Sequence, residues 1–348
     1  MSDTTSTGPS GRISRRGILG GGLTVVAAGA LSACQPHSSS AQAGDGGGSQ
    51  KGKKVIFVVH EKNSFFPPVQ KGFEAFGSAM GWRTQFIGPA TFDQLTVVNM
   101  MQNAVNAKPN GLILTRIDDK SYDGVIKSAQ AADIPVILSN VASKDYQKLG
   151  VGFVGQDFVP AGVTAGNQIL KHITKHTGRT SGAIVIGKIQ AGNSALEQRG
   201  DGIRQAVSEY NDTHGTKFTT EVLIVGTDEA GAVSKIDGRY RRDPHSVAGW
   251  AGTAFECQFV ATWAKSKNLV GKFANGGFDM TAPVLAGIKD GSIDYTIGQN
   301  PWAQGWVAAA LLAQQIDPGY PSFTYDTGAE VVDSSNIAAV SAREAKVA

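Results

Sequence analysis

Residues 55–66 read VIFVVHEKNSFF, an unbroken apolar run that passes directly into polar and aromatic residues. Consecutive β-branched and aromatic residues are typical of a strand that is buried on both faces of a parallel sheet. The next stretch, 67–80, places Val69, Phe73 and Phe76 at the spacing of one helical face. A buried strand followed by an amphipathic helix is the repeating unit of an α/β fold.

The same unit recurs along the chain in two series. The first series is predicted to contain strands at 55–59, 82–87, 111–115, 135–138 and 152–155, with helices at 67–80, 94–106 and 122–132. The second is predicted to contain strands at 182–186, 220–225, 247–250, 272–278 and 295–298, with helices at 160–176, 195–210, 230–241, 253–266, 282–290 and 304–315. Alternating strands and helices predict parallel sheets covered on both faces, and two series predict two such lobes.

Polar and aromatic side chains gather where these predicted strands end. In open parallel sheets, ligands bind beyond the carboxyl ends of the strands. Aromatic rings can cover the C–H faces of a neutral polyhydroxylated ligand, while planar polar groups exchange hydrogen bonds with its hydroxyls. The candidate ligand-binding residues are Asn63, Phe65, Phe66, Asn140, Arg199, Trp250, Asp279 and Gln299. Asn63 has the alternative role of capping the helix that follows it.

Four stretches of the sequence contain most of these candidate residues. In their order along the chain, they resemble the ligand motifs of ribose-type (type I) periplasmic sugar-binding proteins of ABC importers. They are KNSFF at 62–66, SALEQRGDG at 194–202, GFD at 277–279 and TIGQNP at 296–301. The resemblance spans about residues 53–340, so it covers essentially the whole chain after its N-terminal segment.

The resemblance implies an α/β fold of two doubly wound parallel-sheet lobes joined by a three-crossing hinge, with ligand trapped by closure. The lobes would comprise 53–157 plus 300–323 and 158–299 plus 324–348. The crossings would fall near Asp157, near Asn300 and within 323–327.

The resemblance also implies roles for individual side chains. Asn63 would hydrogen-bond ligand hydroxyls, and Phe65 and Phe66 would line one face of a sugar ring. Arg199 would clamp ligand oxygens with its planar fork, and Asp279 and Gln299 would accept and donate hydrogen bonds.

Two stretches depart from the ribose pattern. Ser139-Asn140 stands where ribose-type proteins usually carry Asp-Arg, and Ala251-Gly252 stands where they carry an Asn. We expect Trp250 to fill the second space. The sequence therefore favours a different sugar, a linear polyol or a furanose-like signal molecule over ribose.

The N-terminal residues carry targeting signals. Arg15-Arg16 precede a weakly apolar run at 18–31, which is too short and glycine-rich for a transmembrane helix and is typical of a twin-arginine export signal. The run ends in LSAC, which resembles the lipobox of bacterial lipoproteins, so Cys34 is expected to be lipidated after removal of the signal peptide, 1–33. The Ser/Gly-rich segment 34–52 predicts a flexible tether. We therefore expect a protein anchored to the outer face of the cytoplasmic membrane, in the cell envelope.

Charge and cysteine content narrow the classes of function. The formal net charge is +3, and the first 33 residues contribute +2 of it through three arginines and one aspartate. A nearly neutral mature chain lacks the concentrated basic face that nucleic acids require. Cys257 lies in an apolar helical pattern, so we expect a buried, inert thiol.

Two patterns that suggest cofactors are weak. His172 and His176 have the spacing of a zinc pair, but the Glu of a metalloprotease motif is absent and Lys175 adjoins them, which favours a solvated helix face. The GxGxxG match at 150–155 does not follow a first strand, as a dinucleotide site requires. No metal and no other cofactor is expected.

The sequence thus predicts a monomeric binding subunit that delivers a sugar or polyol to the permease and ATPase of an ABC importer, and not an enzyme. One alternative is a sensor of an autoinducer-like furanose signal on the same fold. The other is a lipid-anchored carbohydrate-active enzyme, which needs two placed carboxylates or a nucleophile with its base. The carboxylates near strand ends are Glu61, Asp118, Asp119 and Asp279.

Overall fold

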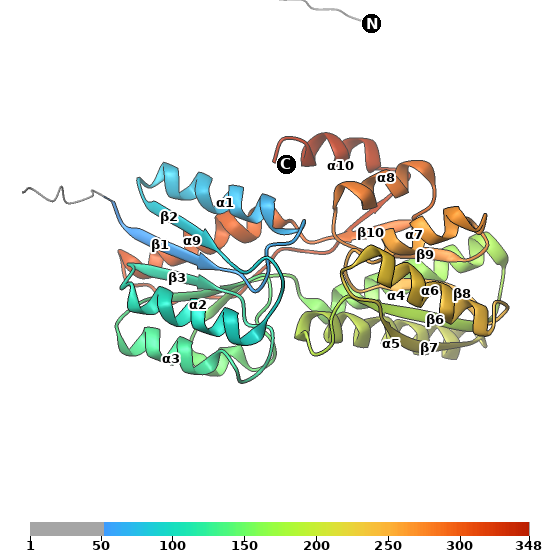
Figure 1. Ribbon diagram of the computed structural model, residues 1–348, viewed down its shortest axis with the longest axis horizontal. Coiled ribbons are helices and arrows are strands. Elements are labelled where there is room, and N and C mark those ends of the chain that lie inside the picture. The colour runs from blue at the N-terminus through green and yellow to red at the C-terminus, as the bar shows by residue number, and fades with distance from the viewer. Residues whose placement is uncertain (1–51, 348) are drawn as a thin grey trace, which may run out of the picture. The chain divides into compact units, whose positions relative to one another are not determined.

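The computed structural model describes residues 52–347, which form two α/β lobes, each built on a six-stranded sheet (Figure 1). The first sheet has the strand order β11-β5-β4-β3-β1-β2, and all its strand pairs are parallel. Its strands are β1 (Lys54–Val58), β2 (Arg83–Ile87), β3 (Gly111–Leu114), β4 (Val136–Ser139), β5 (Gly152–Gly155) and β11 (Tyr325–Asp326). The helices of this lobe are α1 (Phe66–Ala79), α2 (Gln94–Asn106), α3 (Asp123–Ala131), the 3-10 helix η1 (Tyr146–Leu149) and α9 (Pro301–Ile316).

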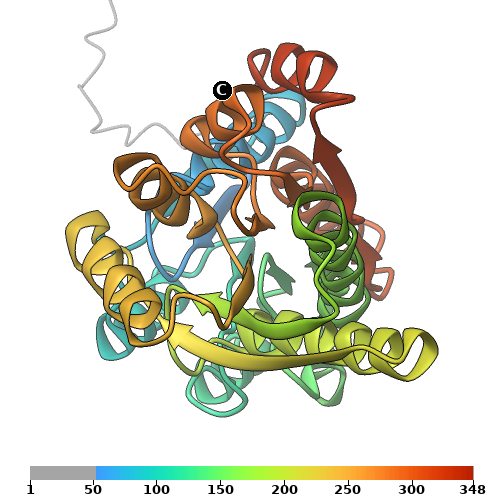
Figure 2. The same cartoon turned by 90° about the vertical axis from the view of Figure 1, so that its right-hand side faces the viewer.

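The second sheet has the order β12-β10-β9-β8-β6-β7, and only the β10–β12 pair in it is antiparallel. Its strands are β6 (Ser181–Lys188), β7 (Lys217–Ile224), β8 (Val247–Gly252), β9 (Ala274–Phe278), β10 (Tyr295–Gly298) and β12 (Glu330–Asp333). The helices of this lobe are α4 (Phe158–Thr177), α5 (Ser194–His214), α6 (Glu229–Arg242), α7 (Cys257–Ser266), α8 (Ala282–Asp290) and α10 (Ile337–Glu344). Figure 2 shows this lobe end-on, with helices on both sides of its sheet.

The unbroken apolar run of β1 is explained by helices on both faces of its sheet. Val55 and Phe57 pack on the side of α1 and α9, whereas Ile56 and Val58 pack on the side of α2 and α3. Successive side chains of a strand point to opposite faces of the sheet. When helices cover both faces, every position of the strand must therefore be apolar. This confirms the predicted fold class.

In each lobe, two helices approach so closely that only glycine fits between them. A Cβ atom on Gly162 of α4 would lie 2.2 Å from the carbonyl oxygen of Arg199 on α5. A Cβ atom on Gly305 of α9 would lie 1.9 Å from the carbonyl oxygen of Val69 on α1. Backbones in direct contact fix the relative position of the paired helices, and Arg199 is thereby held at a fixed height against α4.

The predicted helices and strands through residue 316 are all present, with ends displaced by a few residues. The sequence patterns did not indicate η1, β11, β12 or α10, which are short or lie in polar stretches. The strand expected at 247–250 continues to Gly252, a difference that changes the surroundings of Trp250.

The chain passes between the two sheets three times: between β5 and α4, between β10 and α9, and between β11 and β12. The expected boundary between 323 and 324 is wrong, because Tyr325 and Asp326 pair with Val154 and Gly155 of the first sheet. The third passage therefore follows Asp326.

Within residues 52–347, no helix has both the length and the apolar character needed to span a bilayer. The predicted signal peptide, the lipidation of Cys34 and the tether up to residue 51 lie outside the described residues.

Candidate ligand-binding site

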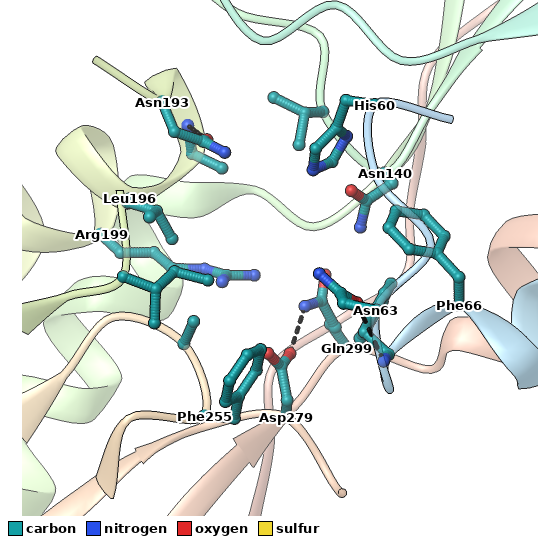
Figure 3. Close-up of a pocket in the computed structure, with 15 residues that line it drawn as sticks. His60, Asn63, Phe66, Asn140, Asn193, Leu196, Arg199, Phe255, Asp279 and Gln299 are labelled. Atoms are coloured by element: carbon teal, nitrogen blue, oxygen red, sulfur yellow. Dashed lines mark hydrogen bonds between the residues drawn. The ribbon is translucent and has the colours of Figure 1, made fainter. Parts of the chain in front are cut away.

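A cavity lies between the lobes, at the carboxyl ends of their strands (Figure 3). The space between its lining atoms, about 420 Å³, includes open solvent at the mouth of the cavity. Near its rim, the backbone N–H of Ser194 donates a hydrogen bond of 3.0 Å to the carbonyl of Ile117, so loops of the two lobes touch. The lining residues are His60, Asn63, Phe65, Phe66, Asn140, Val141, Ile189, Asn193, Ala195, Leu196, Arg199, Ala254, Phe255, Asp279 and Gln299.

Three of the polar lining residues come directly after strands. Asn140 follows β4, Asp279 follows β9 and Gln299 follows β10. Asn140 and Asp279 have φ angles of 68° and 69°, in the left-handed region that Asn and Asp tolerate better than most residues. These residue types therefore turn the chain at the strand end and present a polar group to the cavity.

Arg199 is the cationic group of the site, and its side chain reaches the cavity from α5 (Figure 3). Its Nε donates to Oε1 of Gln156 at 3.1 Å, and its Nη1 donates to the carbonyl of Thr253 at 2.9 Å. The guanidinium also lies 4.2 Å from the centre of the Phe278 ring, a cation–π contact. Burial lowers the pKa of Arg199 to about 10, opposed by Asp279 and Glu256, so the group stays charged at neutral pH. Such a fixed, charged fork can donate to two ligand oxygens.

The other planar groups are oriented by a chain of hydrogen bonds. Nε2 of Gln299 donates to Oδ1 of Asp279 at 2.6 Å, and Nε2 of Gln304 donates to Oε1 of Gln299 at 3.0 Å. Nδ2 of Asn140 donates to Oε1 of Gln304 at 3.1 Å. Within residues 52–347, no hydrogen bond uses Oδ2 of Asp279 or Oδ1 of Asn140. These two oxygens remain available to accept from ligand hydroxyls.

Asp279 is buried beside Arg199. Burial raises the pKa of its carboxyl group, and the charge of Arg199 and the Gln299 hydrogen bond act in the opposite direction. A carboxylate and a guanidinium that face one cavity offer both an acceptor and donors, a combination that fits vicinal hydroxyls.

The wall of the cavity in the first lobe is aromatic. The rings of Phe65 and Phe66 meet edge to face at 5.3 Å, and Phe66 meets His60 in the same way at 5.4 Å. Burial lowers the pKa of His60 to about 4, so the imidazole is neutral at neutral pH. Its Nδ1 has no hydrogen-bond partner in the described part of the chain.

Asn63 shapes the loop that leads into α1. Its Oδ1 accepts from the backbone N–H of Phe65 at 3.0 Å, a bond within the turn. The expected helix cap is not formed, because the N-cap residue of α1 is Phe65 and no side chain caps the helix. The side chain also lines the cavity (Figure 3). The same amide thus shapes the loop and leaves its nitrogen near the cavity.

The structure brings most of the predicted site residues together. Those that line the cavity are Asn63, Phe65, Phe66, Asn140, Arg199, Asp279 and Gln299. Trp250 does not line it, so that prediction is wrong. Because β8 continues to Gly252, Trp250 lies inside the strand and packs edge to face on Trp263 at 6.1 Å, in the core of the second lobe.

Several lining residues were not among the predicted ones. They are His60, Val141, Ile189, Asn193, Ala195, Leu196, Ala254 and Phe255. His60 is the first residue after the apolar run, and Asn193 directly precedes the arginine motif. Their positions in the sequence could therefore have indicated that both residues line the cavity. Phe255 lies five residues beyond Trp250 and supplies the aromatic ring that was assigned to Trp250.

The carboxylates considered for catalysis are not paired at this cavity. Of Glu61, Asp118, Asp119 and Asp279, only Asp279 lines it. Cys257 is 1% exposed, and burial raises the pKa of its thiol well above the ordinary value. The expectation of a buried thiol is confirmed, and its lack of reactivity stays a prediction.

The two-lobed fold and the cavity between its strand ends define a class of binding proteins. The chain matches the model of the periplasmic binding protein domain over residues 55–320, and it belongs to that family. Membership makes it a substrate-binding protein, and members of the family act outside the cytoplasm.

Named relatives support the same class. The xylose/arabinose-binding protein of Sulfolobus acidocaldarius is 25% identical over 82% of this chain and 72% of its own length. The fructose import binding protein of Bifidobacterium longum is 26% identical over 93% of this chain and 95% of its own. An ABC transporter solute-binding protein from Burkholderia graminis, solved with D-arabinose, superposes with a TM-score of 0.73 at 25% identity, covering 83% of this chain and 97% of its own.

Proposed function

We propose that this protein is the capture subunit of an ABC importer for a monosaccharide or a polyol of similar size. The observation that carries the proposal is the cavity itself, in which the charged groups of Arg199 and Asp279 share one lining with the aromatic rings of Phe65 and Phe66. Ligand that bridges both lobes would favour the closed form through its differential affinity for that form.

The chemistry of the lining suits a neutral polyhydroxylated ligand. Arg199 and the amide of Asn63 supply donors, and Asp279 and Asn140 supply acceptors. Phe65, Phe66 and Phe255 supply apolar surface for C–H groups. A single carboxylate in the lining does not favour glycoside hydrolysis, which uses two.

The relatives narrow the first ligands to test. The names of the two curated relatives refer to xylose, arabinose and fructose, and the similar solved structure holds D-arabinose. Pentoses and ketohexoses therefore come first, and polyols follow.

We also propose that the protein is exported and is anchored to the membrane by a lipid. The twin-arginine signal and the LSAC sequence at 31–34 support export and lipidation at Cys34. This would hold the binding lobes at the outer face of the cytoplasmic membrane, within reach of a permease.

The test is a thermal-shift screen of the purified protein against pentoses, hexoses and C4 to C6 polyols, followed by calorimetry on the hits. Saturating ligand that binds only the folded state stabilises it by about 2.7 kcal/mol at a hundredfold excess over the dissociation constant. We expect the unfolding temperature to rise with one group of stereoisomers.

The site is tested by Arg199→Ala, which removes the cationic fork from the cavity. We expect at least a tenfold loss of affinity for the hit, and no loss for the matched variant Arg204→Ala. Arg204 lies on the same helix but pairs with Asp201 at the surface. Unchanged affinity in Arg199→Ala would show that the ligand binds elsewhere, and a screen without any hit would reject the sugar or polyol assignment.

A further inference from the structure

Three metal-ligating side chains meet at the end of the second lobe that lies far from the cavity. His172 and His176 lie one turn apart on α4, and Asp294 immediately precedes β10. One ligand atom from each lies within 4.8 Å of the other two. Gln299, which lines the cavity, follows the opposite end of β10, roughly 16 Å away along the strand. The cluster is therefore separate from the proposed ligand site.

The two imidazoles share one oxygen of the carboxylate. Nε2 of His176 lies 2.6 Å from Oδ1 of Asp294, and Nδ1 of His172 lies 3.5 Å from the same oxygen. Oδ2 of Asp294 accepts a hydrogen bond of 2.8 Å from the backbone N–H of Asn275. That bond orients the carboxylate and leaves Oδ1 toward the histidines, as outer hydrogen bonds commonly do for metal ligands.

The burial of His172 supports a metal site independently of the geometry of the cluster. The sequence suggested a solvated helix face, but His172 is only 5% exposed, so that expectation is wrong for this residue. Neither of its ring nitrogens has a hydrogen-bond partner in the part of the chain that the structure describes. The ring is stacked on Tyr295 with centroids 5.9 Å apart, which fixes its orientation. A buried polar atom without a partner is costly, and a bound cation on Nδ1 would relieve that cost.

The protonation state of His172 agrees with a ligand role. Burial lowers the pKa of His172, with Lys171, Lys175 and His176 acting in the same direction and Asp294 in the opposite one. The neutral imidazole is the form that ligates metals. The two lysines weaken the attraction for any cation, so the affinity should be lower than that of a closed four-ligand site.

We propose that His172, His176 and Asp294 bind a divalent transition-metal ion that ties the end of α4 to the start of β10. Two imidazoles and one carboxylate suit Zn²⁺ or Co²⁺ better than Mg²⁺ or Ca²⁺. In a tetrahedral site with bonds of about 2.0–2.2 Å, ligand atoms lie roughly 3.3–3.6 Å apart. The His172–Asp294 separation of 3.5 Å already fits. The His176 side chain is 22% exposed, so it can rotate outward to widen its contact, and water can reach the fourth position.

The test is a titration of the chelator-treated full chain with Co²⁺, followed by visible absorption, and then competition with Zn²⁺. We expect one ion per chain with the absorption of a tetrahedral centre. His176→Ala should weaken binding at least tenfold, because His176 supplies one of three ligands. The matched control is His214→Ala, which removes an exposed helical histidine of α5 and should leave binding unchanged.

A second readout keeps the test independent of folding defects. Saturating Zn²⁺ should raise the unfolding temperature of the wild type and of His214→Ala, and not that of His176→Ala, whose metal-free circular dichroism should match the wild type. Absence of Co²⁺ and Zn²⁺ binding by the wild type would overturn the proposal. Equal binding by His176→Ala would also overturn it, because the ion would then bind at another place.

Discussion

Oε1 of Gln156 accepts a hydrogen bond of 3.1 Å from Nε of Arg199, and the same side chain ties together the segments that connect the lobes. Gln156 follows β5, on the first passage between the sheets, and is 1% exposed. Its Nε2 donates to the carbonyl oxygens of Gly298, the last residue before the second passage, and Gly328, on the third passage, at 3.3 and 2.9 Å. One planar amide thus couples the cationic group of the cavity to all three passages.

Replacement of Gln156 should therefore weaken ligand binding without touching the ligand. A buried hydrogen bond to a charged group contributes about 1.5–3 kcal/mol, so Gln156→Ala should reduce affinity by at least about tenfold. Calorimetry with the ligand identified in the screen measures this loss. Gln205→Ala, at an exposed position on α5, is the control and should bind as the wild type does.

Gln156→Glu separates the two sets of hydrogen bonds. It keeps an acceptor for Arg199 but loses the donor to Gly298 and Gly328. If the passages matter, its affinity should fall below that of the wild type. Wild-type affinity in Gln156→Ala would mean that Arg199 is positioned without Gln156.

Trp250→Phe should lower stability and leave affinity within twofold of the wild type. Trp250 packs on Trp263 in the core of the second lobe and does not line the cavity. The smaller ring leaves a void, and we expect a loss of about 1–2 kcal/mol in the free energy of unfolding. Urea unfolding and calorimetry measure the two quantities. A large loss of affinity at unchanged stability would return Trp250 to the binding site.

Phe255→Ala, unlike Trp250→Phe, should mainly lower the affinity for the ligand. Its ring lines the cavity and also meets Phe259 edge to face at 6.1 Å. Removing apolar surface from a ligand contact commonly costs about 1–3 kcal/mol, so affinity should fall roughly tenfold or more. The same calorimetric assay tests this, with Trp250→Phe as the comparison. Unimpaired binding would show that the ligand does not reach this wall.

The stability of the ligand-free protein should depend on pH through His60. Burial lowers the pKa of His60 from 6.5 to about 4 in the folded state. Between these values the unfolded chain binds a proton that the folded chain does not. The contribution of His60 to stability is therefore complete above pH 6.5 and is lost as the pH falls toward 4, by an amount on the order of 3 kcal/mol.

Urea unfolding between pH 4.5 and 7.5 checks this dependence. His60→Phe should lose less stability than the wild type on acidification, because it removes the titrating group. His245→Ala, which changes an exposed histidine, should retain the wild-type slope. Parallel slopes for the wild type and His60→Phe would contradict the prediction.

The architecture followed from the sequence because the apolar runs are continuous and separated by helical periodicity. Short elements such as β11 and β12 carry no such signal, since two to four residues in polar stretches are not distinguishable from loops. The misplaced lobe boundary between 323 and 324 arose from this, because the pairing of β11 with β5 is a long-range contact.

Site residues could be predicted where they stand at strand ends, as Asn140, Asp279 and Gln299 do. Trp250 failed because a two-residue extension of β8 moved it from the strand end into the core. Gln156 and Gln304 escaped prediction, since their roles depend on which partners the fold brings near them. Sequence position can indicate that a side chain faces a cleft, but not what holds it there.

The buried thiol of Cys257 makes opening of the second lobe measurable by chemical modification. Cys257 is the only cysteine in the part of the chain that the structure describes, and it is 1% exposed, so a reagent can reach it only when the packing around it opens. The rate at which an alkylating agent modifies Cys257 in the native protein therefore reports how often this lobe opens. Because Cys257 packs inside the second lobe, this rate reports opening of that lobe separately from closure of the cleft between the lobes.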